Sequence, residues 1–146
     1  MTGTLSITST PTLAAATNLL NAAGLPTEDL TPSHCDNFFF VGPADAPTGL
    51  VGLELFGDVA LLRSLVVSSE RRGAGDGAAL LHHAEDHARL HGVRALYLLT
   101  TTAEPFFEKH GYKRADRESA PPAIRSSREF AGICPASSAF MSRNLT

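Results

Sequence analysis

The hydrophobic pattern at the start of the chain predicts a strand followed by a helix. Residues 5–8 alternate between apolar and polar side chains and include β-branched residues, as expected of a short strand. Apolar residues then recur at helical spacing over residues 13–23. Thr10 is the predicted cap of this helix, Pro11 its first residue and Gly24 its end.

The middle of the chain predicts three strands in succession. Residues 37–41 contain three consecutive phenylalanines, which is typical of a buried strand. Residues 50–56 and 59–67 predict a hairpin, because the intervening Gly57-Asp58 has the glycine-first order of a type II′ turn.

Helices and strands alternate in the second half of the chain. The predicted elements are a helix over residues 78–91, a strand over 95–99, a helix over 103–110, and strands over 112–116 and 139–143. Three consecutive strands followed by β-α-β predict a mixed sheet with helices on its faces. We therefore expect an α/β protein in which residues 1–146, a suitable length for one domain, form a single domain.

Composition narrows the possible functions. Apolar residues make up 43% of the chain and charged residues 18%, which is typical of a folded domain and not of a disordered one. The net charge of −3 argues against nucleic acid or an anionic membrane as the main partner. We expect a cytoplasmic protein, since we find neither a secretory signal nor an apolar run near the length of about 18 residues that a membrane span needs.

The cysteines and histidines do not predict a metal site. Cys35 and Cys134 lie far apart and lack metal-ligand spacing. His83, His87 and His91 recur every four residues, which can hold a metal but also describes a solvated or half-buried helix face. No carboxylate or cysteine joins them at a matching step, so we expect no bound metal.

A glycine-rich turn at residues 71–77, between a strand and a helix, is the most informative segment. Glycines let a ligand approach the backbone, and the free N–H groups of a helix N-terminus attract anions. A P-loop is excluded because Gly77 is not followed by Lys and Ser or Thr. A dinucleotide fingerprint matches at Gly73, Gly75 and Ala78, but the acidic residue expected about 20 positions later is missing.

A third pattern, R-x-x-G-x-G, is matched by Arg72, Gly75 and Gly77. It resembles the coenzyme A pyrophosphate loop of the GNAT acetyltransferase superfamily. Residues 106–113 look like a later motif of that family, an aromatic helix end followed by Gly-Tyr, and the resemblance spans at least residues 50–114. Within the superfamily, residues 62–67, 97–102 and 134–138 are similar to the arsenic-resistance N-acetyltransferase group.

The resemblance implies a fold and an activity. The implied fold is a mixed, mostly antiparallel sheet of six to seven strands with about four helices, splayed between the fourth strand (59–67) and the fifth (95–99). The implied enzyme moves acetyl from acetyl-CoA to a primary amine of a small molecule, and the arsenic-resistance group suggests an amino-acid-like arsenic-containing toxin as that molecule. It uses no metal, has no nucleic-acid or membrane partner, and is a monomer or homodimer.

The resemblance also implies which residues bind the cofactor. A strand edge offers backbone groups to the pantetheine arm, a loop wraps the pyrophosphate, and a strand end with the next helix flanks the arm. In that order, the residues are Leu65, Val66 and Val67; Arg72, Gly73, Ala74, Gly75, Asp76, Gly77 and Ala78; and Thr100, Thr102, Phe106 and Phe107.

Three positions depart from the family pattern. Ala74 stands where a cation is common, and Asp76 stands where an aliphatic residue is usual. The Asp76 carboxylate would repel the pyrophosphate unless it points outward at the helix start, where it suits the dipole. Phe107 stands where many relatives carry a tyrosine that protonates the departing thiolate. Either the thiolate leaves unaided, or Tyr97, Tyr112 or a water donates the proton.

Two charged residues lie within the apolar strands of the predicted hairpin. The Gly57-Asp58 turn places Glu54 and Arg63 on one face as diagonal neighbours. In a functional interpretation Glu54 is the general base and Arg63 anchors a substrate carboxylate. In a structural interpretation they form an ion pair on the sheet surface.

Two other functions compete with catalysis. Phe107 and Asp76 suit an acyl-CoA-binding module of the same fold that has lost turnover and acts as a sensor or regulator. The cysteines and histidines suit an arsenic-binding or metal-binding protein.

Overall fold

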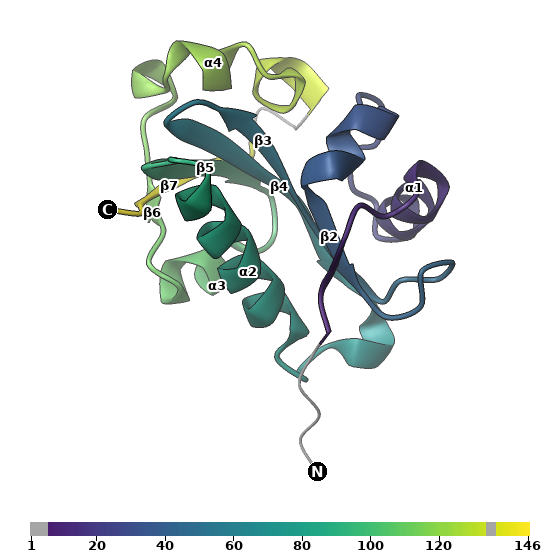
Figure 1. Ribbon diagram of the computed structural model, residues 1–146. Coiled ribbons are helices and arrows are strands. Elements are labelled where there is room, and N and C mark those ends of the chain that lie inside the picture. The colour runs from purple at the N-terminus through teal and green to yellow at the C-terminus, as the bar shows by residue number, and fades with distance from the viewer. Residues whose placement is uncertain (1–5, 134–136) are drawn as a thin grey trace.

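A seven-stranded sheet forms the centre of the protein, in the order β1-β2-β3-β4-β5-β7-β6 (Figure 1). The computed structural model describes residues 6–133 and 137–146. The strands are β1 (Thr8–Ser9), β2 (Phe38–Val41), β3 (Gly49–Phe56), β4 (Val59–Val67), β5 (Ala95–Thr100), β6 (Lys113–Arg114) and β7 (Ala139–Asn144). Neighbouring strands run antiparallel except for β4 and β5, which are parallel, so the predicted mixed sheet is confirmed.

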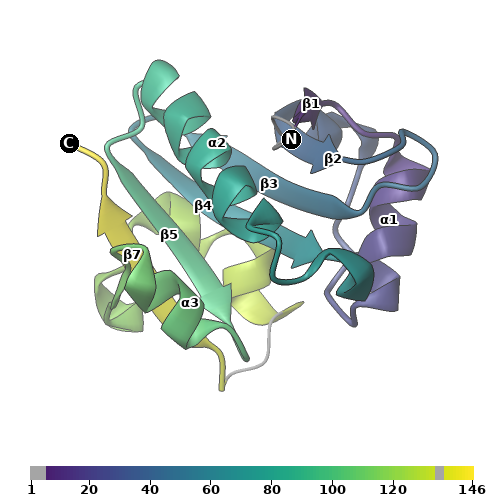
Figure 2. The ribbon, with the colours of Figure 1, turned by 90° about the horizontal axis from the view of Figure 1, so that it is seen from below.

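Helices cover both faces of this sheet (Figure 2). The α-helices are α1 (Leu13–Ala22), α2 (Asp76–Leu90), α3 (Glu104–Lys109) and α4 (Pro122–Arg125). Shorter turns are η1 (Pro32–Asn37), η2 (Ser69–Arg71), η3 (Arg117–Ser119) and the π-helical η4 (Glu129–Ile133). None of the helices in the described ranges has the length and apolar character needed to cross a membrane.

The core is divided by the sheet, because successive side chains of a strand point to opposite faces. Leu53 and Leu62 pack with α2 and α3 on one face. On the other face Leu50 packs against α1 and Leu61 packs against α4. Helices and side chains pack on both faces of β4, so the position of its backbone is determined from both sides.

The first helix starts later than the sequence predicts. Its cap is Thr12 and not Thr10, because the Thr12 hydroxyl accepts a hydrogen bond from the Ala15 N–H at 3.1 Å. Thr10 instead has a φ of 59° and donates its N–H to the Phe38 carbonyl at 2.9 Å. Long-range pairing with β2 therefore overrides the local capping signal. The first strand is also displaced, to Thr8–Ser9, and residue 5 of the predicted strand lies outside the described residues.

The register of the predicted hairpin is confirmed. Glu54 pairs with Leu61, and Gly52 pairs with Arg63, across a turn in which Gly57 has a φ of 74°. Beyond Gly52 the register shifts, which the sequence did not predict.

This shift is a β-bulge in which two residues of β4, Ser64 and Leu65, lie opposite Val51 alone. Ser64 has a positive φ of 60°, which is uncommon for a residue with a side chain. A bulge bends its strand, and here it bends β4 at the place where β4 leaves β5.

The splay between β4 and β5 is also confirmed. The two strands pair from Val59 opposite Ala95 to Leu61 opposite Tyr97, and no pairing is described beyond that point. β5 continues along β7 as far as Thr100. The second half of β4 therefore faces an opening and not a neighbouring strand.

Candidate functional site

The splay opens a cleft of about 570 Å³. Residues 62–65 of β4 line one side, and residues 98–103 at the end of β5 line the other. The segment at residues 24–28 closes one end, while Phe107 and Glu129 also contribute side chains. The cleft therefore combines a bulged strand edge with residues from several other parts of the chain.

The bulged strand is the part of the predicted cofactor edge that reaches this cleft. Leu65 lines the cleft, together with Ser64. Val66 is buried against α1, and Val67 packs toward α2 on the opposite face. The extra residue of a bulge is left out of the ladder. This edge can therefore offer backbone N–H groups to a ligand carbonyl.

The glycine-rich turn has the backbone of an anion site. Gly73 and Gly75 have φ values of 83° and 87°, and nothing lies within 4 Å of the place where either would carry a Cβ atom. Gly75 is the N-cap of α2, a helix of 15 residues whose first N–H groups have no helical partner. Arg72 and Ala74 are exposed beside them. A phosphate could approach these N–H groups without obstruction.

Asp76 does not point outward as one of the two expectations for it required. Its side chain is only 3% exposed, so it does not point outward into solvent. Both its oxygens accept hydrogen bonds from Arg71, at 3.0 Å each from Nε and Nη2. The guanidinium neutralises the carboxylate locally, which offsets the repulsion expected toward a pyrophosphate. Helix α2 also begins at Asp76, two residues before the predicted start.

The remaining predicted cofactor residues link the turn to the cleft. Thr100 and Thr102 line the cleft, and the Thr100 hydroxyl accepts the Ala103 N–H at 3.0 Å. Phe107 lines it as well, whereas the ring of Phe106 lies 3.7 Å from the place where Gly77 would carry a Cβ atom. Ala78 follows Gly77 in the first turn of α2. The two phenylalanines thus span the distance from helix α2 to the cleft.

Arg63 is fully buried and is surrounded by acidic side chains. Its guanidinium binds both oxygens of Asp29, with Nη2 at 2.9 Å from Oδ1 and Nη1 against Oδ2. Nη1 also donates to Glu54 at 2.7 Å, and Nη2 lies 3.2 Å from a Glu129 oxygen. Nε donates to the Ser64 hydroxyl at 3.1 Å. All three guanidinium nitrogens are therefore occupied by groups of the protein.

The predicted ion pair between Glu54 and Arg63 is present, but the predicted anchoring role of Arg63 does not fit. A guanidinium has five N–H groups in a fixed plane, and here each nitrogen already faces a protein partner. Burial alone would lower the pKa of Arg63, but its hydrogen bonds to Asp29 and Glu54 and the negative charges around it raise the pKa instead. Arg63 has no free donor for a substrate carboxylate.

Glu129 is the acidic residue of this group that faces the cleft. It is 5% exposed and lines the cleft, whereas Glu54 does not line it. Burial raises the pKa of Glu129 to about 7, against the opposing effect of the Arg63 charge, and the charges of Asp29 and Glu54 contribute to the rise. A carboxyl with this pKa can accept a proton and release it near neutral pH.

The sequence pattern did not identify Asp29 or Glu129 as partners of Arg63. Both lie in irregular segments, one before η1 and the other at the start of η4, where no periodicity predicts what a side chain faces. We find no local signal in the sequence that identifies either residue.

Neither tyrosine suggested as a proton donor lies in the cleft. Tyr97 stacks on Phe140, with ring centroids 5.6 Å apart, and does not line the cleft. Tyr112 is buried and donates its hydroxyl to Glu85 at 2.9 Å. Burial, together with the Glu85 charge, raises the pKa of Tyr112. The positions of Tyr97 and Tyr112 therefore do not support the role suggested for either of them.

A serine that the sequence analysis did not select lies in the cleft. Ser138 is 6% exposed, and its Oγ has no hydrogen-bond partner among the residues that the structure describes. A buried hydroxyl without a partner is uncommon, because leaving it unpaired costs about 1–3 kcal/mol. The Ser138 hydroxyl therefore has unused hydrogen-bonding capacity in a residue that lines the cleft.

The histidines of α2 form a half-buried helix face. His83 and His87 each pack edge-on against Phe39, with centroids 4.7 and 4.8 Å apart, and His87 lies 4.2 Å from His91. Burial lowers the pKa of His87, and the neighbouring histidines add to this effect. The packing against Phe39 supports the structural interpretation of this spacing.

One further candidate metal site and one candidate arsenic ligand can be placed. Asp29, His34 and Glu54 bring ligand atoms within 4.8 Å of one another, but both carboxylates already bind the Arg63 guanidinium. The cation at this place is thus supplied by the chain itself. Cys35 is buried as a free thiol, and Cys134 lies outside the described residues.

Comparison with known proteins supports the fold and the family. The family model for the acetyltransferase (GNAT) domain matches residues 35–114. An amino-acid acetyltransferase of Ralstonia nicotianae is 38% identical over 63 residues, which are 43% of this chain and 14% of that protein. The chain therefore spans only a small part of this curated relative.

Two solved structures resemble the whole chain. N-acetylglutamate synthase from Neisseria gonorrhoeae, complexed with coenzyme A and N-acetyl-glutamate, superposes with a TM-score of 0.81 at 23% identity. It covers 100% of this chain, which in turn covers 36% of that one. Rv2747 from Mycobacterium tuberculosis, in complex with CoA and NLQ, superposes with a TM-score of 0.74 at 17% identity. That match covers 97% of this chain and 99% of the Rv2747 chain. At these identities the likeness concerns the fold.

Proposed function

This chain belongs to the GNAT acetyltransferase domain family, and from that premise we propose that it transfers the acetyl group of acetyl-CoA to the primary amine of a small molecule. The observation that carries the proposal is the cleft at the splay of β4 and β5. It has a glycine turn with free N–H groups beyond the end of β4 and a carboxyl with a pKa of about 7 within it. In this proposal residues 1–146 act as one GNAT unit.

Acetyl-CoA would bind along the second half of β4. Its pyrophosphate would accept hydrogen bonds from the first N–H groups of α2, where the helix dipole favours an anion. Its pantetheine arm would run between the edge at Leu65 and the residues at Thr100 and Thr102. The coenzyme A named in the Neisseria and Mycobacterium complexes is consistent with this assignment.

The chemistry follows from the groups that face the cleft. The amine nitrogen forms a bond to the thioester carbon, the C–S bond breaks, and the sulfur leaves as a thiolate. The proton of the amine passes to Glu129, and a backbone N–H at the bulge polarises the carbonyl. A thiol of ordinary pKa, about 8.5, leaves readily as a thiolate, so Phe107 does not prevent the reaction.

The acceptor is the finer part of the proposal. Resemblance to the arsenic-resistance group suggests an amino-acid-like amine that contains arsenic, and the Ralstonia relative is named as an amino-acid acetyltransferase. A panel of primary amines, with thiol release from acetyl-CoA as the readout, tests the acetyl-transfer proposal. Release that requires an amine supports it.

The competing function is an acyl-CoA-binding module without turnover. Phe107, in place of a tyrosine, favours this alternative. The other argument for it, repulsion between Asp76 and the pyrophosphate, is weaker because Arg71 neutralises Asp76. Tight binding of acetyl-CoA without thiol release from any amine would favour the binding module.

A glycine substitution tests the cofactor site. We expect Gly75→Val to weaken coenzyme A binding on the order of 100-fold or more, because losing two charge-assisted hydrogen bonds costs about 3–6 kcal/mol. Valine is strained at the φ of 87° and would project into the space that the pyrophosphate needs. The affinity is measured by titration calorimetry.

Gly57→Val is the matched control. Gly57 has a φ of 74° and open space around it, so valine there meets similar strain, but it lies in the turn between β3 and β4. We expect Gly57→Val to lose thermal stability and to bind coenzyme A with unchanged affinity. If Gly75→Val, shown to be folded by its circular dichroism, also binds normally, the pyrophosphate site is assigned wrongly.

A further inference from the structure

The charge of the cleft bears on which amines it can accept. Three charged residues line it among the described residues, namely Glu28, Arg63 and Glu129. Two of them are acidic, and two more carboxylates, Asp29 and Glu54, bind Arg63 directly. Even when Glu129 is protonated, the three other carboxylates outnumber the single positive charge of Arg63.

No free cation offsets this excess within the described part of the cleft. Arg63 is the one lysine or arginine among the lining residues, and each of its guanidinium nitrogens faces a protein partner. The two ranges outside the description, residues 1–5 and 134–136, contain no lysine or arginine in the sequence. A carboxylate that enters beside the reacting amine would therefore meet negative charge and no unoccupied guanidinium.

Ser138 provides an independent observation at the same place. Ser138 lines the cleft, and its hydroxyl is buried and lacks a partner within the described residues. A hydroxyl oxygen accepts hydrogen bonds from an ammonium or amine N–H. Together with the carboxylate of Glu129, it forms a place suited to a group that donates hydrogen bonds and carries positive charge.

Resting on the proposed function, we infer that the acceptor is a primary amine with no carboxylate on the carbon that bears the amine, and that a second positive charge on the acceptor improves its use. Specificity of this kind arises from repulsion of the wrong partner as much as from attraction of the right one. Amino acids are then poor acceptors, and this narrows the proposed function away from the amino-acid-like arsenic compound that the resemblance suggests and from the amino acids for which the Ralstonia relative is named.

Four amines separate the two parts of this inference. Norvaline, norvalinamide and butylamine share a carbon chain. The carbon that bears the amine carries a carboxylate in norvaline, a neutral amide in norvalinamide and neither group in butylamine. The fourth, 1,4-diaminobutane, is butylamine with a second amine. The readout is kcat/KM for each amine, from thiol release with saturating acetyl-CoA.

We expect norvaline to be used on the order of 100-fold less well than norvalinamide, because juxtaposed like charges cost several kcal/mol. Norvalinamide controls for the size of the carboxylate. We also expect 1,4-diaminobutane to be used better than butylamine, with an advantage that shrinks at high salt as the charges are screened.

Two results would contradict this inference in different ways. If norvaline is used as well as norvalinamide, the inference about the carboxylate is overturned, while the thiol release itself upholds acetyl transfer. If no amine releases thiol although acetyl-CoA binds, the proposed function fails and the inference fails with it.

A variant tests the contribution of the cleft charge directly. We expect Glu28→Gln to reduce the preference for 1,4-diaminobutane over butylamine about two- to fivefold, since an exposed charge interaction contributes up to about 1 kcal/mol. Glu118→Gln removes an exposed carboxylate that does not line this cleft and should leave the preference unchanged. An equal loss in both variants, or no loss in Glu28→Gln, would contradict the assigned effect of Glu28.

Discussion

Glu129→Gln is expected to reduce acetyl transfer to amines by a factor on the order of 10²–10⁴, the usual contribution of a general base. The amide keeps the size of the side chain and can still lie beside Arg63, but it cannot accept the proton of the amine. Acetyl-CoA affinity should stay unchanged, because the glycine turn that would hold the pyrophosphate is remote from this side chain in sequence and belongs to another element. Thiol release and calorimetry measure the two quantities on the same preparation.

Glu54→Gln is the matched control for this prediction. It also removes one carboxylate from Arg63, but Glu54 does not line the cleft. We expect a much smaller loss of turnover than in Glu129→Gln. If Glu54→Gln loses turnover and Glu129→Gln does not, the proton is accepted at Glu54, as the pattern of the hairpin first suggested.

The pH dependence provides a second test of the same base. Because the pKa of Glu129 is raised to about 7, its proton-accepting form is scarce at pH 5 and predominates at pH 8. The rate should therefore increase with pH through about 7 and level off above it. The measurement uses an acceptor amine whose own pKa lies below 5. This amine stays neutral over the whole pH range, so the inflection reports the titration of a group on the enzyme. Glu129→Gln should lose this inflection, and an inflection retained in the variant would assign it to another group.

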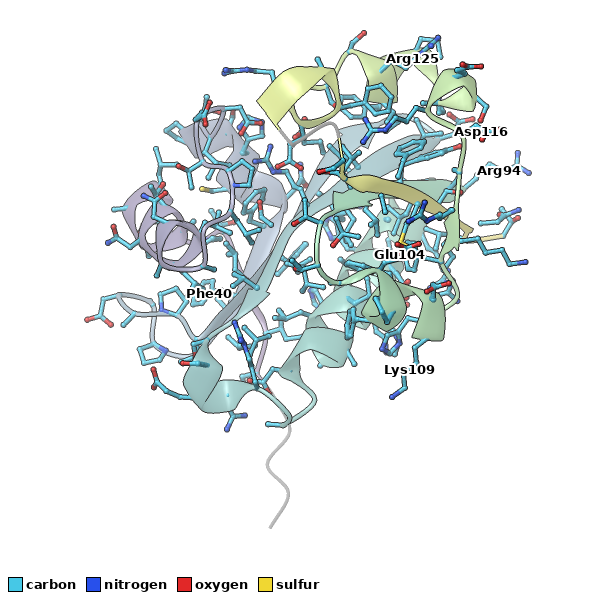
Figure 3. The ribbon with its side chains drawn as sticks, turned by 180° about the vertical axis from the view of Figure 1, so that it is seen from behind. Phe40, Arg94, Glu104, Lys109, Asp116 and Arg125 are labelled. Carbon is cyan, nitrogen blue, oxygen red and sulfur yellow. The ribbon has the colours of Figure 1, made fainter. Side chains whose placement is uncertain are left out.

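Arg63→Met is expected to lower the free energy of unfolding by about 3–5 kcal/mol at pH 7, the usual effect of removing one partner of a buried ion pair. The methionine fills much of the same volume, but Asp29, Glu54 and Glu129 are left without their cation. Urea denaturation measures the loss. Arg125→Met is the control, since Arg125 is exposed on α4 and its side chain extends from the surface (Figure 3), and its effect should stay within about 0.5 kcal/mol.

The loss in Arg63→Met should depend on pH with a defined sign. Without the guanidinium, the buried carboxylates take up protons more readily in the folded state than in the unfolded chain. The variant is then least destabilised at acid pH and loses stability as the pH rises. In the native protein the hydrogen bond and charge of Arg63 outweigh burial and lower the pKa of Asp29, so that this contribution to stability is lost as the pH falls. A loss in the variant that is small and independent of pH would show that Arg63 does not stabilise these carboxylates.

Local signals were sufficient where neighbouring residues decide the conformation. The Gly57-Asp58 turn determined the register of β3 and β4, because a two-residue turn allows one pairing of its flanking strands. The glycine turn before α2 was recognised for a similar reason, since positive φ at Gly73 and Gly75 favours glycine at those positions. The splay of β4 and β5 followed from resemblance and not from local pattern.

Local signals failed where a distant partner competes with a neighbour. Thr10 has the chemistry of a helix cap, but its N–H pairs with Phe38 and Thr12 caps the helix instead. Asp76 was assigned from its place at a helix start, and the bidentate contact with Arg71 keeps it buried. In both cases a hydrogen bond that the local pattern did not reveal decided the outcome.

By itself, the sequence determined the order of the elements, the hairpin register and the glycine turn, since each depends on backbone preferences of adjacent residues. Only the tertiary structure decided the acceptor end of the cleft. Arg63, Asp29 and Glu129 come from a strand and two irregular segments, and the packing of these segments around the splay brings them together. Burial then raises the pKa of Glu129, and the acidic partners occupy the N–H donors of Arg63. Desolvation depends on everything that surrounds a side chain, and no local pattern of residues encodes it.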